Sequence, residues 1–352
     1  MWKSTTFDRS LKGNRKTEHL GIWHKERSEK DSYILGSVSK RYKMTANKNT
    51  MVLITSENLS DNLAWVSYID YFQKVSNGKV RVCSPYKYLF EESYPNLDFF
   101  ELLGEYKSVW HIPSIKNKVE NLVVFGGKNP TGVNLKGSDT QTLGAGLAFG
   151  VDRDGLLAKG GRMVDHYTRK SGKEQVPNRQ MEATTKLGFK AYKEIPPILN
   201  IPLLEPPTTI PYITISVHAK DKNLYWNNPA GWQDLVDYLI SLDYVVVAID
   251  DQSNLNGVSI PNRALNATGK FKLEHKASQI KQAKLHIGVK SDLSWLSWAV
   301  GTPTLTISSE YPEFERNSIH VVTDQDSESI QFTEVKSALD TLIEAIDNGQ
   351  FT

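Results

Sequence analysis

Short apolar runs that alternate with longer amphipathic stretches are the feature that most constrains the fold of this chain. Residues 51–55 form an apolar run of strand length, and residues 80–83 form the next one. Between them, Trp65, Ile69 and Phe72 recur at a spacing that places them near one face of a helix. Strand, helix and strand at this spacing are typical of βαβ units around a parallel sheet. The sequence therefore predicts an α/β fold.

The same alternation returns in the second half of the chain and defines a second domain. Further strands are predicted at residues 109–112, 122–125, 212–216, 244–249, 285–289 and 304–307. Further helices are predicted at 87–94, 140–149, 232–242, 275–284, 295–300 and 333–347. Two Rossmann-like parallel-sheet domains that face a cleft are a frequent plan for ligand binding.

Composition places the boundaries between these parts. Residues 1–48 are polar and rich in lysine, and they predict a basic arm or small subdomain. We expect an N-terminal Rossmann-like domain at 49–195, which carries a basic, glycine-rich insertion at about 152–194. The proline-rich stretch 196–211 predicts a linker, and 212–352 the second Rossmann-like domain.

Charge is unevenly distributed along a chain whose net charge is only +2. Residues 1–193 carry 31 Lys/Arg against 20 Asp/Glu, a balance of +11, which leaves −9 for the remainder. This asymmetry favours a polyanionic partner such as DNA for the N-terminal half, although ordinary solvated lysines would give the same count.

Cysteine content and hydropathy restrict the cellular context. Cys83 is the single cysteine, which excludes a disulfide or a cysteine metal cluster within one chain. No apolar run approaches the ~20 residues of a membrane span, and the N-terminus lacks the apolar core of a signal peptide. We therefore expect a cytoplasmic protein.

The first candidate site is Asp61, which follows a predicted strand and precedes a predicted helix. Ligands bind at this edge of a parallel α/β sheet, so its carboxylate could act as a general base on an acceptor hydroxyl. Aspartate is also a common helix N-cap. Position alone favours the N-cap.

Two further candidate sites follow strands of the second domain. The first comprises Lys220, Lys222, Trp226, Asn227 and Asn228, where two lysines near a helix N-terminus could hold a diphosphate. The alternative is a surface loop with helix-capping asparagines. The second site comprises Lys290, Ser291, Asp292 and Ser294, where free backbone N–H groups could bind phosphate and capping by Ser291 or Asp292 is the alternative.

Other catalytic patterns do not fit the chain. There is no Walker P-loop, no H-E-x-x-H and no G-x-S-x-G motif, and the eight histidines lack metal-ligand spacing. The pair Asp250 and Asp251 at a strand end could bind a ribose or a metal, but a solvated loop explains it as well.

Several of these motifs together resemble the bacterial autotransporter heptosyltransferases. The resemblance rests on residues 225–232 (YWNNPAGW), on the strand at 244–250 and on residues 287–299 (IGVKSDLSWLSWA), and on residues 61–65 (DNLAW) followed by Tyr94 and Pro95. It implies a GT-B fold and an inverting, metal-independent glycosyltransferase that needs no cofactor beyond an ADP-heptose donor. It also implies that Asp61 is the catalytic base, that Lys222 or Lys220 binds the donor phosphate, and that Ser291 belongs to the phosphate loop.

The chain departs from that family in ways that leave the acceptor open. Ser60 replaces a glycine, Lys290 and Asp292 replace small residues, and the family's C-terminal iron-binding cysteines are missing. We expect a macromolecular acceptor, and the favoured one is the hydroxymethylated bases of phage DNA. The protein is then expected to act in a bacterial or phage-infected cell. The alternatives are a serine of a surface protein and a non-catalytic sugar-nucleotide-binding relative. The expected acceptor-binding residues are Lys159, Arg162, Arg169, Lys170, Lys173 and Arg179.

Overall fold

The computed structural model divides into two compact units, Met1–Ile195 and Pro196–Thr352. It describes residues 50–100, 121–125, 179–221 and 224–350, apart from 55, 77, 188, 190–191, 270, 309–312, 315 and 324–326. The predicted arm at 1–48, the strand at 109–112, the helix at 140–149 and the part of the insertion before residue 179 lie outside the described residues.

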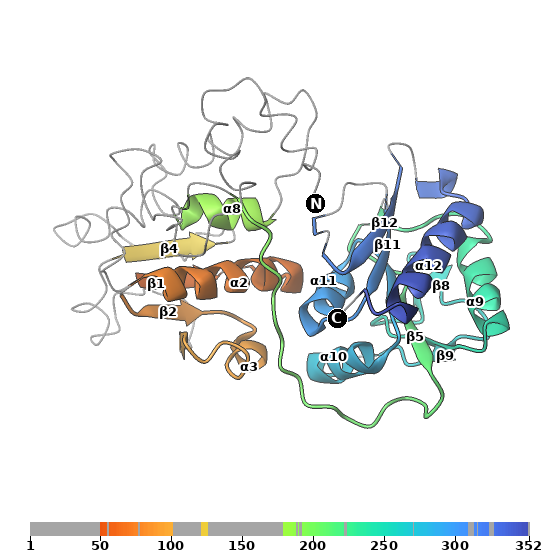
Figure 1. The fold of residues 1–352 in the computed structure, drawn as a ribbon, viewed down its shortest axis with the longest axis horizontal. Helices are drawn as coiled ribbons and strands as arrows, with labels where there is room; N and C mark the ends of the chain where they lie inside the picture. Colours follow the sequence, from red (N-terminus) through yellow and green to blue (C-terminus); the bar gives the residue numbers. More distant parts are fainter. Residues whose placement is uncertain are drawn as a thin grey trace, which may run out of the picture. The chain divides into compact units, whose positions relative to one another are not determined.

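The first unit contains a four-stranded parallel sheet of order β3-β2-β1-β4 (Figure 1). Its elements are β1 (Thr50–Ile54), α2 (Leu59–Val75), β2 (Val80–Cys83), α3 (Lys87–Phe90), β3 (Asp98–Phe100), β4 (Asn121–Phe125) and α8 (Arg179–Lys186). The predicted βαβ unit is therefore confirmed. The helix expected at 87–94 is shorter, because hydrogen-bonded turns replace it after Phe90. β3 was not predicted, since three residues give no readable period.

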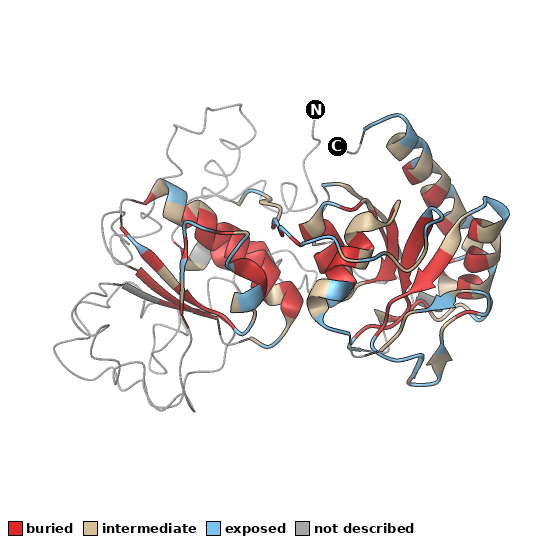
Figure 2. Cartoon of the chain, turned by 90° about the horizontal axis from the view of Figure 1, so that it is seen from below, coloured by how far each residue is buried: buried red, intermediate tan, exposed pale blue. Residues whose placement is uncertain are grey.

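Helix α2 is the central helix of this unit. Twelve of its seventeen residues are buried, so that it needs cover on more than one side (Figure 2). Helix α8 packs against it, and Phe189 stacks on Tyr71 and meets Tyr68 edge to face. Tyr68 donates to the carbonyl of Lys193 at 2.5 Å, and burial raises the pKa of its phenol. These contacts fasten α8, Phe189 and Lys193 to α2.

The second unit contains a six-stranded parallel sheet of order β12-β11-β10-β5-β6-β9. The strands of this sheet are β5 (Tyr212–Ser216), β6 (Val245–Ala248), β9 (Leu265–Asn266), β10 (His286–Val289), β11 (Thr304–Ser308) and β12 (Ser318–Val322). The helices are α9 (Gly231–Ser241), α10 (Leu273–Gln282), α11 (Asp292–Val300) and α12 (Phe332–Asp347), with a short turn η4 (Ser327–Ser329). A small hairpin, β7 (Asn254–Leu255) and β8 (Val258–Ser259), follows β6.

The predicted strands and helices of this unit are confirmed, with shifts of up to three residues at their ends. β9 and β12 were not predicted. β9 has two residues, both exposed, and β12 is only half-buried, so neither presents the apolar run by which the inner strands are recognised. In Figure 2 the inner strands are coloured as buried along their length.

The proline-rich stretch 196–211 belongs to the second unit and is fastened along it. Leu199 donates its backbone N–H to the carbonyl of Ala299 at 2.8 Å. Leu204 donates to the hydroxyl of Ser278, and its carbonyl accepts from the Gln282 side chain. None of the helices that the structure describes is long and apolar enough to cross a membrane.

Candidate functional site

Asp61 lies in the first turn of α2, at the carboxyl end of β1. The helix begins at Leu59, so Asp61, which was expected to precede the helix, lies within it. Asn58 occupies the N-cap position, and the hydrogen bonds to the Asp61 carboxylate come from side chains. The N-cap alternative for Asp61 is therefore wrong, and its carboxylate is available for another task.

Three side chains surround that carboxylate. The hydroxyl of Ser56 donates to Oδ2 at 2.5 Å, and Asn58 Nδ2 donates to the same oxygen at 3.3 Å. Nε of Arg179 donates to Oδ1 at 2.5 Å. The side chain of Asp61 is 17% exposed, which leaves it partly accessible to a ligand.

Asn62 holds the loop that carries two of these partners. Its side chain is wholly buried, and its Nδ2 donates to the carbonyls of Ser56 and Asn58, each at 2.8 Å. Its Oδ1 accepts from the hydroxyl of Ser84, in the loop after β2, at 2.8 Å. The sequence placed Asn62 in a motif but gave no sign of this role, because its partners come from two different loops.

In the second unit, two neighbouring strands end in polar loops. β5 and β10 are adjacent, with Ser216 opposite Gly288, so the loops that follow them start side by side. Lys220 is exposed in the first of these loops, and Lys222 lies outside the described residues. Lys290, Ser291 and Asp292 form the second loop and the start of α11. The structure thus brings part of each predicted donor site to one edge of the sheet.

The N-terminus of α11 has features suited to an anion. Ser291 occupies the N-cap position, yet its hydroxyl makes no capping bond, and its Oγ is buried without a partner among the described residues. The backbone N–H groups of a first turn are free of intrahelical bonds, and the helix dipole favours negative charge there. Lys290 pairs with Glu313 at 3.3 Å, so part of its charge is already balanced. Asp292 is exposed.

The aromatic segment 225–232 contributes buried supports. Trp226 is 1% exposed, and its indole N–H donates to the carbonyl of Ile330 at 3.0 Å. Asn228 donates to the same carbonyl at 3.1 Å and accepts from the backbone N–H of Ala230. Asn227 is half-buried. This segment therefore fastens the start of α9 to the chain just before α12.

A buried polar cluster lies beneath the loop after β10. The two ring nitrogens of His286 lie 3.1 Å from Thr214 Oγ1 and 3.2 Å from Ser216 Oγ. Ser294 is buried, and its hydroxyl donates to the carbonyl of Val289 at 2.7 Å. Burial lowers the pKa of His286 from 6.5 to about 3. The imidazole therefore stays neutral in the folded protein across the physiological range.

Acidification is expected to destabilise the second unit through His286. Between pH 7.5 and pH 5 the unfolded chain takes up a proton near pH 6.5 that the folded chain does not bind. This histidine alone therefore lowers the free energy of unfolding by about 2 kcal/mol, and the loss continues down to about pH 3. Urea denaturation at the two pH values measures the effect.

His286→Gln should remove this part of the pH dependence, whereas the exposed His275→Gln should keep it. An unchanged pH dependence in His286→Gln would contradict the assignment. If that variant does not fold, NMR titration of the His286 ring in the wild type gives the same answer, and protonation near pH 6.5 would refute it.

Asp250 is a structural residue that the sequence left open as a ribose or metal ligand. It is 2% exposed and accepts from the backbone N–H groups of Val217 and His218 at 2.9 and 3.0 Å. Burial lowers the pKa of His218, but Asp250 and the carbonyl of Val258 outweigh it, so the net shift is upward. Asp250 thus shapes the loop after β5 and is not a solvated residue. Within the described ranges, no group of three or more His, Cys, Asp and Glu could hold a metal ion.

Of the expected acceptor-binding residues, only Arg179 is described, and it contacts Asp61. Lys159, Arg162, Arg169, Lys170 and Lys173 lie outside the described residues.

Comparison with known proteins gives local sequence matches. No protein-family model matches the chain. It is 38% identical over 122 residues to the autotransporter heptosyltransferase BAHTCr of Citrobacter rodentium, and this match covers 33% of this chain and 29% of that protein. It is 36% identical over 120 residues to Aah of Escherichia coli, covering 33% and 30%. It is 29% identical over 119 residues to BimC of Burkholderia thailandensis, described as inactive, covering 33% and 28%. The matched stretch spans less than a third of each relative's length.

Solved structures match over most of the chain. The iron-containing dodecameric glycosyltransferase TibC from enterotoxigenic E. coli H10407 superposes with a TM-score of 0.59 at 18% identity, covering 86% of this chain and 78% of that one. E. coli ADP-heptose lipopolysaccharide heptosyltransferase II superposes with a TM-score of 0.54 at 14% identity, covering 85% and 99%. These matches and the parallel sheets give the chain the GT-B fold, which confirms the predicted fold class.

Proposed function

We propose, from the distant homology of this chain to the bacterial autotransporter heptosyltransferases, that it is a glycosyltransferase. The donor is a nucleotide-activated sugar of the ADP-heptose class. A solved structure of TibC is in complex with ADP-D-beta-D-heptose. That structure superposes with a TM-score of 0.60 at 19% identity, covering 86% of this chain and 78% of that one. The observation that supports catalysis most is Asp61, a partly exposed carboxylate at a strand end that is held by side chains instead of capping its helix.

In the proposed reaction Asp61 acts as the general base. Its carboxylate takes the proton of the acceptor hydroxyl, and the oxygen uses the freed electron pair to bond the anomeric carbon of the sugar. The bond between that carbon and the diphosphate oxygen breaks, and its electrons leave with the nucleoside diphosphate. Attack from the face opposite the leaving group inverts the anomeric centre. The proposal uses no metal ion, because a helix N-terminus and lysine side chains provide positive charge for the leaving group.

The donor diphosphate is proposed to bind at the start of α11. The hydroxyl of Ser291, which has no partner among the described residues, and backbone N–H groups in the first turn of α11 would donate to phosphate oxygens. Lys220 and Lys222, in the neighbouring loop, would add charge, and Lys290 would do so after exchanging Glu313 for phosphate. Asn227 and Asp292 would line the site. Trp226, Asn228 and Ser294 would support it from within the fold, since their polar groups are engaged there.

For the acceptor, a hydroxyl of a protein has the better support. The relatives are autotransporter heptosyltransferases by name, which points to a surface protein as the acceptor. The DNA acceptor rests on the +11 balance of residues 1–193 and on basic residues mostly outside the described part. The DNA acceptor is the second candidate because of that positive charge balance. Because one relative is described as inactive, a non-catalytic role for this chain is one of the outcomes that the test distinguishes.

Donor binding and transfer test the proposal in two steps. Calorimetry should detect binding of ADP-heptose at least about tenfold tighter than UDP-glucose or GDP-mannose. Incubation with an autotransporter passenger domain or with duplex DNA containing hydroxymethylcytosine, followed by mass spectrometry, then identifies the acceptor. Binding with no transfer to either acceptor and no donor hydrolysis would support the non-catalytic alternative.

Ser291→Asp tests the donor site. A carboxylate at the N-cap repels phosphate, so donor affinity should fall more than about tenfold. The matched control is Ser241→Asp, which places the same charge at the exposed C-terminal end of α9 and should leave affinity unchanged. Wild-type affinity in Ser291→Asp, or no binding of any nucleotide sugar to the wild type, would refute this site.

A further inference from the structure

We infer that Arg179 is a positioning residue that holds the Asp61 carboxylate in one orientation, a role that rests on the function proposed above. This differs from the acceptor binding expected of Arg179 from the sequence. The two residues are 118 positions apart, and Arg179 is the first residue of α8.

The hydrogen bonds of Asp61 assign different tasks to its two oxygens. Each carboxylate oxygen has about two lone-pair sites. Oδ2 accepts from Ser56 and Asn58, which fills both of its sites. Oδ1 accepts from Arg179, and no other donor among the described residues reaches it. Oδ1 is therefore the oxygen that keeps a lone pair for the proton of the acceptor hydroxyl.

Arg179 can hold that oxygen in place because its own backbone is fixed to the same helix. Its carbonyl accepts from the indole N–H of Trp65 at 3.2 Å. Trp65 is four residues after Asp61, so the two lie on one face of α2, one turn apart. Arg179 is thus held through its side chain by Asp61 and through its backbone by Trp65.

The next residue secures the start of α8 further. Gln180 is wholly buried, and its amide donates to the carbonyl of Ile195 at 2.6 Å and accepts from the backbone N–H of Ile195 at 3.0 Å. It also donates to the hydroxyl of Ser67 at 3.2 Å. The guanidinium therefore reaches Asp61 from a rigid base, which suits a residue that orients another.

Loss of this contact should slow transfer without weakening donor binding. With Arg179 replaced by glutamine, only Oδ2 of Asp61 remains held, by Ser56 and Asn58. The carboxylate can then turn about these bonds, and fewer encounters find Oδ1 facing the hydroxyl. We expect kcat to fall about tenfold or more, with the donor KM within about twofold of the wild type. Arg179→Lys, which restores a cationic donor, should recover part of the loss.

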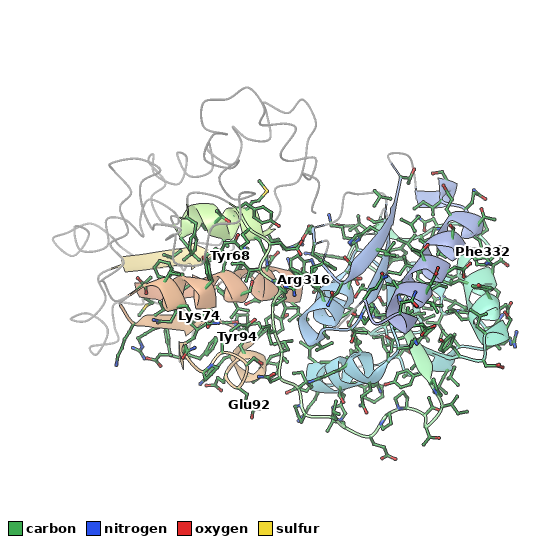
Figure 3. All side chains as sticks on the ribbon, in the orientation of Figure 1. Tyr68, Lys74, Glu92, Tyr94, Arg316 and Phe332 are labelled. Atoms are coloured by element: carbon green, nitrogen blue, oxygen red, sulfur yellow. The ribbon has the colours of Figure 1, made fainter. Side chains whose placement is uncertain are left out.

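The experiment compares wild type, Arg179→Gln, Arg179→Lys and a control in steady-state kinetics with ADP-heptose and the acceptor identified above. The control is Lys74→Gln, which removes another ion-paired cation in the last turn of α2 (labelled in Figure 3) and should leave kcat unchanged. Thermal unfolding of each variant verifies folding, and if Arg179→Gln does not fold, Arg179→Lys carries the comparison, with an intermediate kcat and an unchanged donor KM expected.

The outcomes separate the two proposals. If the wild type transfers sugar and the folded Arg179 variants have its kcat, the inference about Arg179 alone is wrong. A raised acceptor KM with unchanged kcat would make Arg179 an acceptor-binding residue and would also overturn it. If the wild type transfers no sugar, the proposed function fails first, and the positioning role fails with it.

Discussion

Asp61→Asn is expected to lower the rate of sugar transfer by about 10²- to 10⁴-fold, the range that a general base typically contributes. The amide has nearly the shape of the carboxylate, so its oxygen can keep one set of the hydrogen bonds from Ser56, Asn58 and Arg179. It cannot take the proton of an acceptor hydroxyl. Donor affinity should stay within about twofold, since the proposed donor residues lie in the other unit. Kinetics and calorimetry on the same preparation measure the two quantities.

Asp98→Asn is the matched control for this substitution. Asp98 is an exposed carboxylate of the same unit, and it too pairs with an arginine, Arg81, at 2.7 Å. Exposed pairs of this kind contribute little to stability, so this variant should keep wild-type kinetics. A folded Asp61→Asn variant that transfers sugar within a few-fold of the wild-type rate would exclude Asp61 as the base.

Gly231→Ala is expected to destabilise the second unit by about 3 kcal/mol. A methyl group at this position would lie 2.5 to 2.8 Å from three ring carbons of Trp226, closer than side chains approach one another. The ring has little room to move, because it is buried, meets Trp232 edge to face at 5.3 Å, and donates to Ile330. Overpacking of a core costs about 1–3 kcal/mol, and a lost buried hydrogen bond a similar amount.

Urea denaturation followed by tryptophan fluorescence measures the change in the free energy of unfolding. The neighbouring Ala230→Ser is the control, since Ala230 is exposed at the N-cap of α9, where serine is favoured. Wild-type stability in Gly231→Ala would mean that Trp226 moves freely. The buried support that this segment is proposed to give the donor loops would then be wrong.

The amphipathic alternation of the chain was sufficient to predict both parallel sheets and most of their elements. β5 was predicted at residues 212–216, as the structure has it, because four successive apolar or β-branched residues followed by Ser216 form a short run of strand length. The start of α2 was placed too late. Ser60 and Asp61 are polar, a pattern that predicts a loop, yet both lie in the first turn of the helix. That difference also decided against the N-cap role of Asp61.

The sequence by itself determined the fold class and the placement of Asp61 and Ser291 after the ends of predicted strands. It could do so because hydrophobic periodicity is a local pattern, which can be read without knowing which residues meet in the fold. The tertiary structure decided which groups those residues meet. Arg179 reaches Asp61 across 118 positions, and Trp226 reaches Ile330 across 104. A hydrogen bond between groups so far apart in the sequence depends on how helices and strands pack, and no spacing within the chain predicts it.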